Sequence, residues 1–177
     1  MLLGMVIMSV QQQGFNHIRL TVLEDIKNLA PRLRFEDKRE ILSSIGLTPY
    51  EGLYYSYKHS TVCFTIFNSK NIPIAIFGVN QITNSLSSIW LLASNGLKEV
   101  EIPFLRQCRN LVNFLTNKHK ILFNFVDCRN ELHIKWLRWC GFKFLRKTNY
   151  GVLNQPFYEI IKIFLNKFEN KSFSSHI

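Results

Sequence analysis

The sequence lacks several features that would take a protein out of the ordinary globular classes. Its four cysteines form no Cys-x-x-Cys pair, and no histidine lies near them at the spacing of a zinc site. Its apolar runs fall well short of the roughly 20 residues that a membrane-spanning helix needs. Proline and glycine are scarce, with 5 and 8 residues of 177. We therefore expect no disulfide framework, no metal site, no membrane span and no disordered linker.

The first residues of the chain are apolar, but they lack the basic leader and cleavage site of a secretory signal. We therefore expect a cytoplasmic protein. Met5 and Met8 are alternative start positions, because residues 11–14 look like a polar lead-in. With 177 residues, of which 47% are hydrophobic, the chain has the size and the core of one domain. We expect a flexible or mis-assigned lead over 1–14, one domain over 15–164 and a basic tail over 165–177.

Acidic residues are also scarce, since 12 Asp and Glu stand against 22 Lys and Arg, which gives a net charge of +10. Such an excess attracts polyanions, which include nucleic acid, an anionic surface and a phosphate-bearing cofactor. The charge alone does not choose among these partners. A solvated basic surface with no polyanionic partner is equally compatible with it.

Hydrophobic periodicity predicts a defined order of strands and helices. The order is a strand, three helices, three strands, a helix, a strand, a helix and two strands. These elements are expected over residues 17–20, 22–33, 35–45, 49–58, 61–67, 72–79, 88–93, 103–115, 121–126, 130–140, 142–145 and 157–164. Three antiparallel strands in succession are the simplest arrangement of 61–67, 72–79 and 88–93.

Local signals mark where several of these elements begin and end. Thr48, followed by Pro49 and Glu51, is a typical helix start with a capping residue, a proline and a glutamate. Gly46 and Gly141 each follow the last periodic residue of a helix. Glycine is favoured there because it adopts the left-handed conformation that ends helices.

The helix expected over 130–140 carries a spaced motif with Asn130, His133, Leu137 and Gly141-Phe142. Its spacing resembles the Asn-x-x-Ala-x-x-x-Tyr-x-x-x-Gly-Phe pattern of acyltransferases with the GNAT fold, and the element order is similar to theirs. The resemblance implies an α/β (α+β) protein with a mixed, mostly antiparallel twisted sheet. That sheet would have about six to seven strands, flanked by helices, with two central strands that splay apart.

A narrower resemblance covers residues 130–141 together with the segments that begin at Trp90 and Leu122. These look like the small acetyltransferase-like internal virion proteins of short-tailed phages. This resemblance implies a phage origin, phage virion or host proteins as partners, and a location in the host cytoplasm or packaged in the virion.

The GNAT resemblance also implies acetyl-CoA as cofactor, bound between the strands over 88–93 and 121–126. The pyrophosphate would lie at the start of the next helix, where free backbone N–H groups favour an anion. In this chain the loop before that helix has one glycine and also contains Glu99 and Glu101, which repel phosphate. The positions that match the cofactor-binding residues of the fold are Leu91, Leu92, Ala93, Gly96, Lys98, Arg106 and Asn130.

Two residues are candidates for catalysis. Leu137 occupies the position where many relatives have a tyrosine that protonates the departing thiolate, and leucine cannot do so. His133 lies one turn earlier on the same helix face, so it is either a replacement acid or a structural histidine. Asp127, at the end of a central strand, is either a general base or the cap of the following helix.

The sequence therefore predicts an acyl-CoA-dependent N-acetyltransferase that acts on a protein or small-molecule amine. Two alternatives remain open. One is a protein that keeps the fold without catalysis, as an internal virion or assembly component. The other is a basic module that binds nucleic acid without sequence specificity, because Trp136 and Trp139 alternate with Lys135 and Arg138.

Overall fold

A computed structural model describes residues 17–164 of the chain, without the side chains of residues 98–108 and 117. The lead expected over 1–14 and the tail expected over 165–177 lie outside the described residues. Within them, no helix is long and apolar enough to cross a membrane.

Every predicted helix and strand is present, with small changes in the bounds. The strands are β1 (Ile18–Leu20), β2 (Val62–Phe67), β3 (Pro73–Gln81), β4 (Leu86–Ala93), β5 (Ile121–Asp127), β6 (Lys143–Tyr150) and β7 (Gln155–Ile163). The helices are α2 (Leu23–Leu29), α3 (Phe35–Ile45), α4 (Pro49–His59), α5 (Glu101–His119) and α6 (Glu131–Trp139). Short 3₁₀ turns, η1 (Ala30–Arg32) and η2 (Asn95–Val100), precede α3 and α5.

The seven strands form one sheet in the order β1-β2-β3-β4-β5-β7-β6. All neighbouring strands are antiparallel except β4 and β5, which are parallel. β4 and β5 pair only from Leu86 to Ser88 and from Ile121 to Phe123, so their remaining residues diverge. The mixed, mostly antiparallel sheet and its splayed central strands are confirmed.

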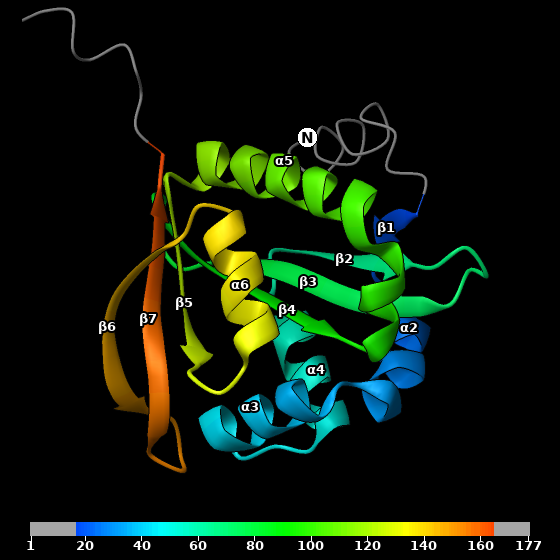
Figure 1. The fold of residues 1–177 in the computed structure, drawn as a ribbon, viewed down its shortest axis with the longest axis horizontal. Helices are drawn as coiled ribbons and strands as arrows, with labels where there is room; N and C mark the ends of the chain where they lie inside the picture. Colours follow the sequence, from blue (N-terminus) through cyan, green and yellow to red (C-terminus); the bar gives the residue numbers. More distant parts are fainter. Residues whose placement is uncertain (1–16, 165–177) are drawn as a thin grey trace, which may run out of the picture.

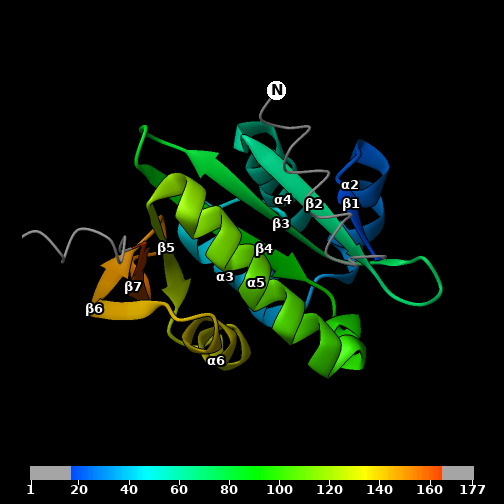
Figure 2. The same cartoon turned by 90° about the horizontal axis from the view of Figure 1, so that it is seen from above.

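Helices cover both faces of this sheet. α5 and α6 lie on one face, and α2, α3 and α4 lie on the other (Figures 1 and 2). β4 contributes to both layers because its side chains alternate. Ile89 and Leu91 pack with Leu111 of α5 in one buried cluster, whereas Trp90 and Leu92 join the cluster of the other face.

The C-terminal strands differ most from the prediction. β7 lies between β5 and β6, so β6 is the edge strand of the sheet. β6 extends to Tyr150, five residues beyond the predicted end at 145. An edge strand needs few apolar residues, and the part of β6 beyond 145 reads Arg-Lys-Thr-Asn-Tyr, so hydrophobic periodicity does not detect it.

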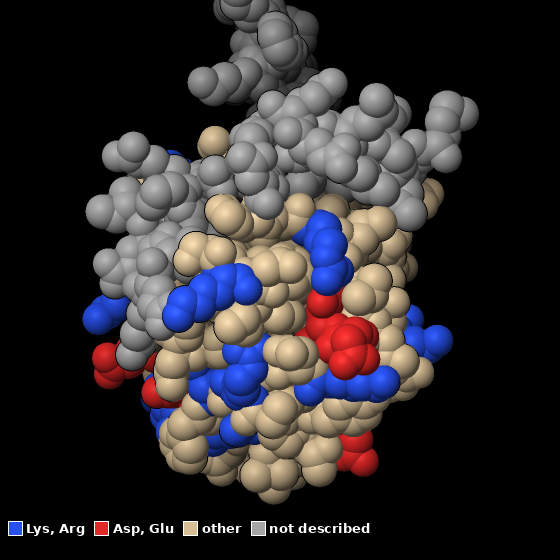
Figure 3. Space-filling model, turned by 90° about the vertical axis from the view of Figure 1, so that its right-hand side faces the viewer, with Lys and Arg blue, Asp and Glu red and all other residues tan. Residues whose placement is uncertain are grey.

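Charged side chains do not form one continuous basic surface on the side of the molecule nearest β1 and α2. Among the described residues there, lysine and arginine side chains are spread among uncharged ones and lie beside a group of acidic side chains (Figure 3). The described lysine and arginine side chains on this side are therefore not concentrated as a nucleic-acid-binding stripe would require.

Gly141 ends α6 with φ at +84°, as predicted, and the Phe142 N–H donates back to the Leu137 carbonyl at 3.0 Å. A Cβ at Gly141 would lie 3.2 Å from the Lys162 ammonium nitrogen. We expect Gly141→Val to lower the free energy of unfolding by about 1–2 kcal/mol, the cost of left-handed backbone for a side chain. Denaturant unfolding measures this change. Gly141→Asn should lose less, and equal stability of the valine variant and the parent would contradict this helix end.

Candidate functional site

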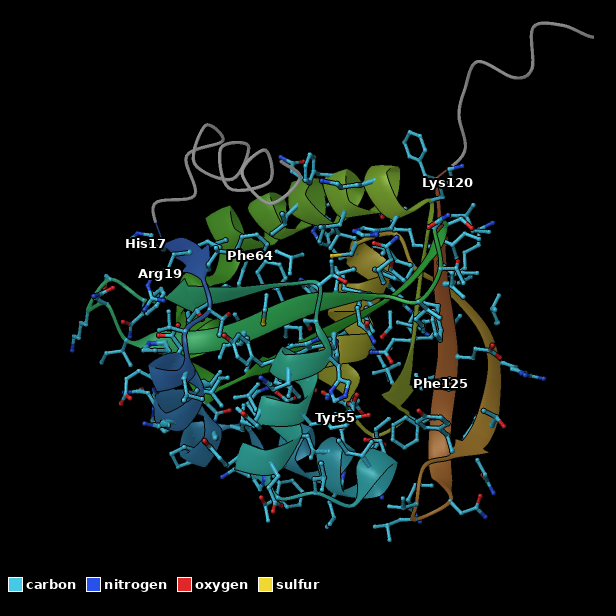
Figure 4. The ribbon with its side chains drawn as sticks, turned by 180° about the vertical axis from the view of Figure 1, so that it is seen from behind. His17, Arg19, Tyr55, Phe64, Lys120 and Phe125 are labelled. Atoms are coloured by element: carbon cyan, nitrogen blue, oxygen red, sulfur yellow. The ribbon has the colours of Figure 1, made fainter. Side chains whose placement is uncertain are left out.

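A cavity of about 220 Å³ lies where β4 and β5 diverge, on the face covered by α3 and α4. Its walls also include the first turn of α6 and the ends of β6 and β7. Tyr55 on α4 and Phe125 on β5 lie on opposite sides of the region between these two elements (Figure 4). The divergence of two central strands therefore opens a space that reaches the middle of the sheet.

Three polar side chains meet at one end of this cavity. The Asn130 amide nitrogen donates to the Glu40 carboxylate at 3.0 Å, and the Asn130 oxygen accepts from the His133 backbone N–H at 3.4 Å. His133 Nδ1 lies 3.9 Å from a Glu40 oxygen and has no hydrogen-bond partner among the described residues. α3 thus supplies a carboxylate and α6 an imidazole to the same point.

The same asparagine connects the cavity to a buried ion pair. Asp37 accepts hydrogen bonds from the Arg34 guanidinium at 2.7 and 3.0 Å, from the Ala93 backbone N–H at 2.8 Å and from the Asn130 amide at 3.1 Å. Arg34 and Asp37 are 3% and 1% exposed. This network joins α3, the end of β4 and the start of α6, so it positions the three elements that frame the cavity.

The backbone of β4 is open at Leu91. The pairing with β3 uses alternate residues of β4, including Leu92, so Ile89, Leu91 and Ala93 direct their backbone groups toward β5. The Ile89 carbonyl accepts from the Asn124 side chain at 2.6 Å, and Ala93 is bonded through both its N–H and its carbonyl. Leu91, between them, presents its N–H and carbonyl to the gap between the strands. Of the predicted cofactor-binding positions Leu91, Leu92 and Ala93, Leu91 is therefore the one whose backbone N–H and carbonyl face the gap beside β5.

The structure describes only some of the residues predicted to bind the pyrophosphate. Gly96 lies in η2, where a Cβ would approach an Ile74 side-chain carbon to 2.9 Å, so this position requires a very small residue. The backbones of Lys98 and Arg106 lie in η2 and α5, but their side chains are outside the described residues.

A second cavity, of about 300 Å³, lies between η2 and the start of α6. Arg34, Arg129 and Lys135 line it, together with the carboxylates of Glu36 and Glu131. Lysine and arginine side chains therefore lie near the start of α6. The first backbone N–H groups of a helix have no partner within that helix, so they are available here to a ligand.

Asp127 is not arranged as a general base. Its carboxylate is buried and accepts from the Arg129 backbone at 2.8 Å and from the Arg129 guanidinium at 2.7 Å, with Arg39 at 3.7 Å. Burial by itself would raise the pKa of Asp127, but these hydrogen bonds and positive charges outweigh it and hold the pKa below its usual value. The alternative prediction that Asp127 caps the next helix is wrong, because Asn130 is the N-cap of α6.

Of the other predicted residues of α6, Leu137 and Trp136 face the core, whereas Trp139 is exposed. Leu137 is 3% exposed and packs in the core, and its hydrocarbon side chain has no proton to donate. Trp136 is partly buried against the same core, and its indole N–H has no hydrogen-bond partner among the described residues. It borders two spaces of about 10 Å³ between β4 and the helices α5 and α6. Trp139 is 48% exposed, with the Arg109 guanidinium 5.3 Å from its ring centroid.

The described cysteines do not form a nucleophilic site. Cys63 and Cys140 are buried, and burial raises the pKa of each thiol to about 12. Burial also raises the pKa of Cys128. At neutral pH these thiols stay protonated and are therefore poor nucleophiles.

No known family profile matches the sequence, and no curated protein is significantly similar to it. Solved structures are similar in fold. A phosphinothricin acetyltransferase of the GNAT superfamily from Sinorhizobium meliloti, with AcCoA, is 12% identical at a TM-score of 0.63, over 89% of this chain and 93% of that one.

Two further structures are similar. The spermidine N-acetyltransferase from Vibrio cholerae, with CoA and spermine, is 13% identical over 82% and 94% of the two chains, with a TM-score of 0.57. The ribosomal-protein-S5-alanine acetyltransferase from Vibrio fischeri is 18% identical over 82% and 91%, with a TM-score of 0.55. The chain therefore has the GNAT fold, and its structural neighbours are N-acetyltransferases.

Glu40 lines the cavity but was not among the residues predicted for the site. Asp37 and Glu40 lie three residues apart on α3, so both carboxylates reach the same face. That spacing was the available signal, but it stands in the charged run Glu36-Asp37-Lys38-Arg39-Glu40, which is also typical of a solvated helix face.

Proposed function

We propose that the protein is an acetyl-CoA-dependent N-acetyltransferase that acts on an amine. The observation that carries the proposal is the divergence of β4 and β5, which leaves the Leu91 backbone open beside a cavity that contains Glu40 and His133. The fold of the N-acetyltransferases described above supports it.

The residues present suit acetyl-CoA. Bound acetyl-CoA supplies an acyl carbon activated as a thioester. The Leu91 N–H and carbonyl would pair with the amide groups of its pantetheine arm, as an added strand pairs with a sheet edge. The buried indole N–H of Trp136 is a further donor beside this path. Because each space there is about 10 Å³, room for about one water, the Trp136 ring would have to shift to admit the arm.

The phosphates would lie in the second cavity, at the start of α6 rather than at the start of α5 as the GNAT resemblance implied. Lys135 is exposed there, and the free N–H groups at the start of α6 favour an anion. Lys98 and Arg106, predicted for the same purpose, remain proposed charge partners. Glu36 and Glu131 line the same cavity, so the phosphate-binding strength rests on the balance of these charges.

The cavity residues account for the proton transfers. An amine reaches the site as an ammonium ion, and the Glu40 carboxylate takes one proton from it, which makes the nitrogen nucleophilic. The nitrogen bonds to the acyl carbon, the carbon–sulfur bond breaks, and the nitrogen loses its second proton as the sulfur gains one. His133, which lines the same cavity, is the proposed carrier of that proton. The products are the acetylated amine, free CoA and one proton.

The finer predictions remain predictions. A phage origin, virion or host-protein partners and packaging have no support in the fold or in the structural neighbours. Nucleic-acid binding is supported by the net charge and by the exposed ring of Trp139, whereas Trp136 is part of the core contacts rather than an exposed stacking surface.

Acetyl-CoA binding tests the proposal directly. At about a hundred times its dissociation constant, acetyl-CoA should stabilise the protein by about 2.7 kcal/mol, or roughly 5–10 °C in melting temperature. Lys135→Gln should weaken its affinity by up to about fivefold, the effect of one exposed charge contact. Lys143→Gln, at an exposed lysine on β6, is the matched control and should change nothing. Absence of any stabilisation at millimolar acetyl-CoA would contradict the proposed function.

A further inference from the structure

The cavity between β4 and β5 has a charge opposite to that of the protein. The chain carries a net charge of +10, yet none of the described residues that line this cavity is lysine or arginine. Glu40 is its one carboxylate, and its side chain is 14% exposed. The lining thus combines one carboxylate with the imidazoles of His59 and His133 and with side chains that carry no charge.

Glu40, which is partly buried, differs from the fully buried carboxylates in having no arginine or lysine partner among the described residues. Asp25, Asp37 and Asp127 each lie 2.7 Å from an arginine nitrogen. Among the described residues, Glu40 has the Asn130 amide at 3.0 Å and the His133 ring at 3.9 Å, but no lysine or arginine within ion-pair distance. A carboxylate removed from water is stabilised by a cation, so the cavity favours a ligand that brings one.

Aromatic rings form two walls of the same cavity. Phe125 and Tyr150 are stacked with centroids 4.0 Å apart, and Tyr150 meets Phe157 edge-on at 5.3 Å. Tyr55 and His59 on α4 lie 4.0 Å apart on another wall. The faces of these rings attract cations and bury apolar groups.

We propose that the acceptor is a small cationic amine with an aromatic or apolar body, and that amines which also carry a carboxylate are rejected. The ammonium group lies at Glu40, where it loses its proton and attacks the thioester as described above. The apolar body lies between the aromatic walls. A carboxylate beside the amine would enter the field of Glu40 with no lysine or arginine to receive it. This inference rests on the proposed acetyltransferase activity.

The matched acceptors are 2-phenylethylamine, phenylalanine and phenylalaninamide, which share the ring and the primary amine. With acetyl-CoA as donor, kcat/KM for 2-phenylethylamine should exceed that for phenylalanine by about 10²-fold, as expected for one unfavourable charge contact in a partly buried site. Phenylalaninamide has the bulk of phenylalanine without its negative charge and should lie within about tenfold of 2-phenylethylamine. In Glu40→Gln the ratio of 2-phenylethylamine to phenylalanine should fall below about tenfold, although both rates decrease.

Calorimetric binding of the three compounds to the intact protein, with and without CoA, separates this inference from the proposed function. If acetyl-CoA binds but phenylalanine and 2-phenylethylamine react or bind equally well, the acceptor class is overturned and the acetyltransferase stands. If acetyl-CoA does not bind, the proposed function fails, and the amine affinities decide the character of the cavity. In that case, equal affinities for the amines, or no binding of 2-phenylethylamine, would also overturn the proposal that the cavity selects cationic amines without a carboxylate.

Discussion

Replacing Glu40 by glutamine is expected to lower kcat for amine acetylation by about 10²–10⁴-fold, the usual contribution of a positioned proton acceptor. Glutamine keeps the length of the side chain, and its carbonyl oxygen can still accept from the Asn130 amide that lies 3.0 Å from Glu40. The variant therefore removes the negative charge and the proton acceptor while it preserves the packing of α3 against α6. Release of free CoA at saturating acetyl-CoA measures the effect.

His133→Ala is the companion variant, and it should lower turnover by about 10²-fold while the affinity for acetyl-CoA stays nearly intact. The double variant tests whether the two groups act together, since side chains 3.9 Å apart in one proton path should not have additive effects. Full turnover in Glu40→Gln would remove Glu40 as the base. Full turnover in His133→Ala with tight acetyl-CoA binding would spare the enzyme and rule out a catalytic role for His133.

Replacing Asp37 by alanine is expected to lower the free energy of unfolding by about 3–5 kcal/mol, because it leaves the Arg34 guanidinium buried without its counter-charge. Arg34 is 3% exposed, so water cannot replace the lost carboxylate. The Ala93 N–H and the Asn130 amide lose an acceptor at the same time. Denaturant unfolding followed by circular dichroism measures the loss.

Two comparisons show whether burial is the cause. Arg146→Ala breaks the Arg146–Glu159 pair at the same 2.7 Å, but Arg146 is 73% exposed, so it should cost no more than about 1 kcal/mol. The double variant Arg34→Met with Asp37→Leu removes both buried charges and should recover much of the loss. If Asp37→Ala and Arg146→Ala cost the same, the buried network does not hold these elements together.

Much of the fold could be predicted because its signals are local. The Thr48 side chain accepts from the Glu51 N–H, and the Glu51 carboxylate accepts from the Thr48 N–H, as their spacing predicts. Gly46 and Gly141 both have positive φ at the helix ends where they were expected. In each case the interacting groups are within a few residues of one another, so the pattern of the chain contains the whole interaction.

The candidate site was predicted less completely. Leu91, Asn130 and His133 lie around the diverging strands. Their positions could be predicted because the GNAT resemblance aligned the α6 motif and the β4 segment with the cofactor-binding elements of that fold. Asp127 was expected as a base or a cap, but Arg129, two residues later, binds its carboxylate instead. Glu40 was missed, because a glutamate on an amphipathic helix has no local mark of burial.

The amino-acid sequence by itself determined which segments form helices and strands, where several of them end, and that the first three long strands follow one another. The tertiary structure decided the insertion of β7 between β5 and β6 and the point at which β4 and β5 separate. It also decided the contact of Asn130 with Asp37 and Glu40, which lie 93 and 90 residues away along the chain. Pairing, splaying and buried polar contacts depend on which surfaces meet after folding, and neither periodicity nor capping signals extend over such separations.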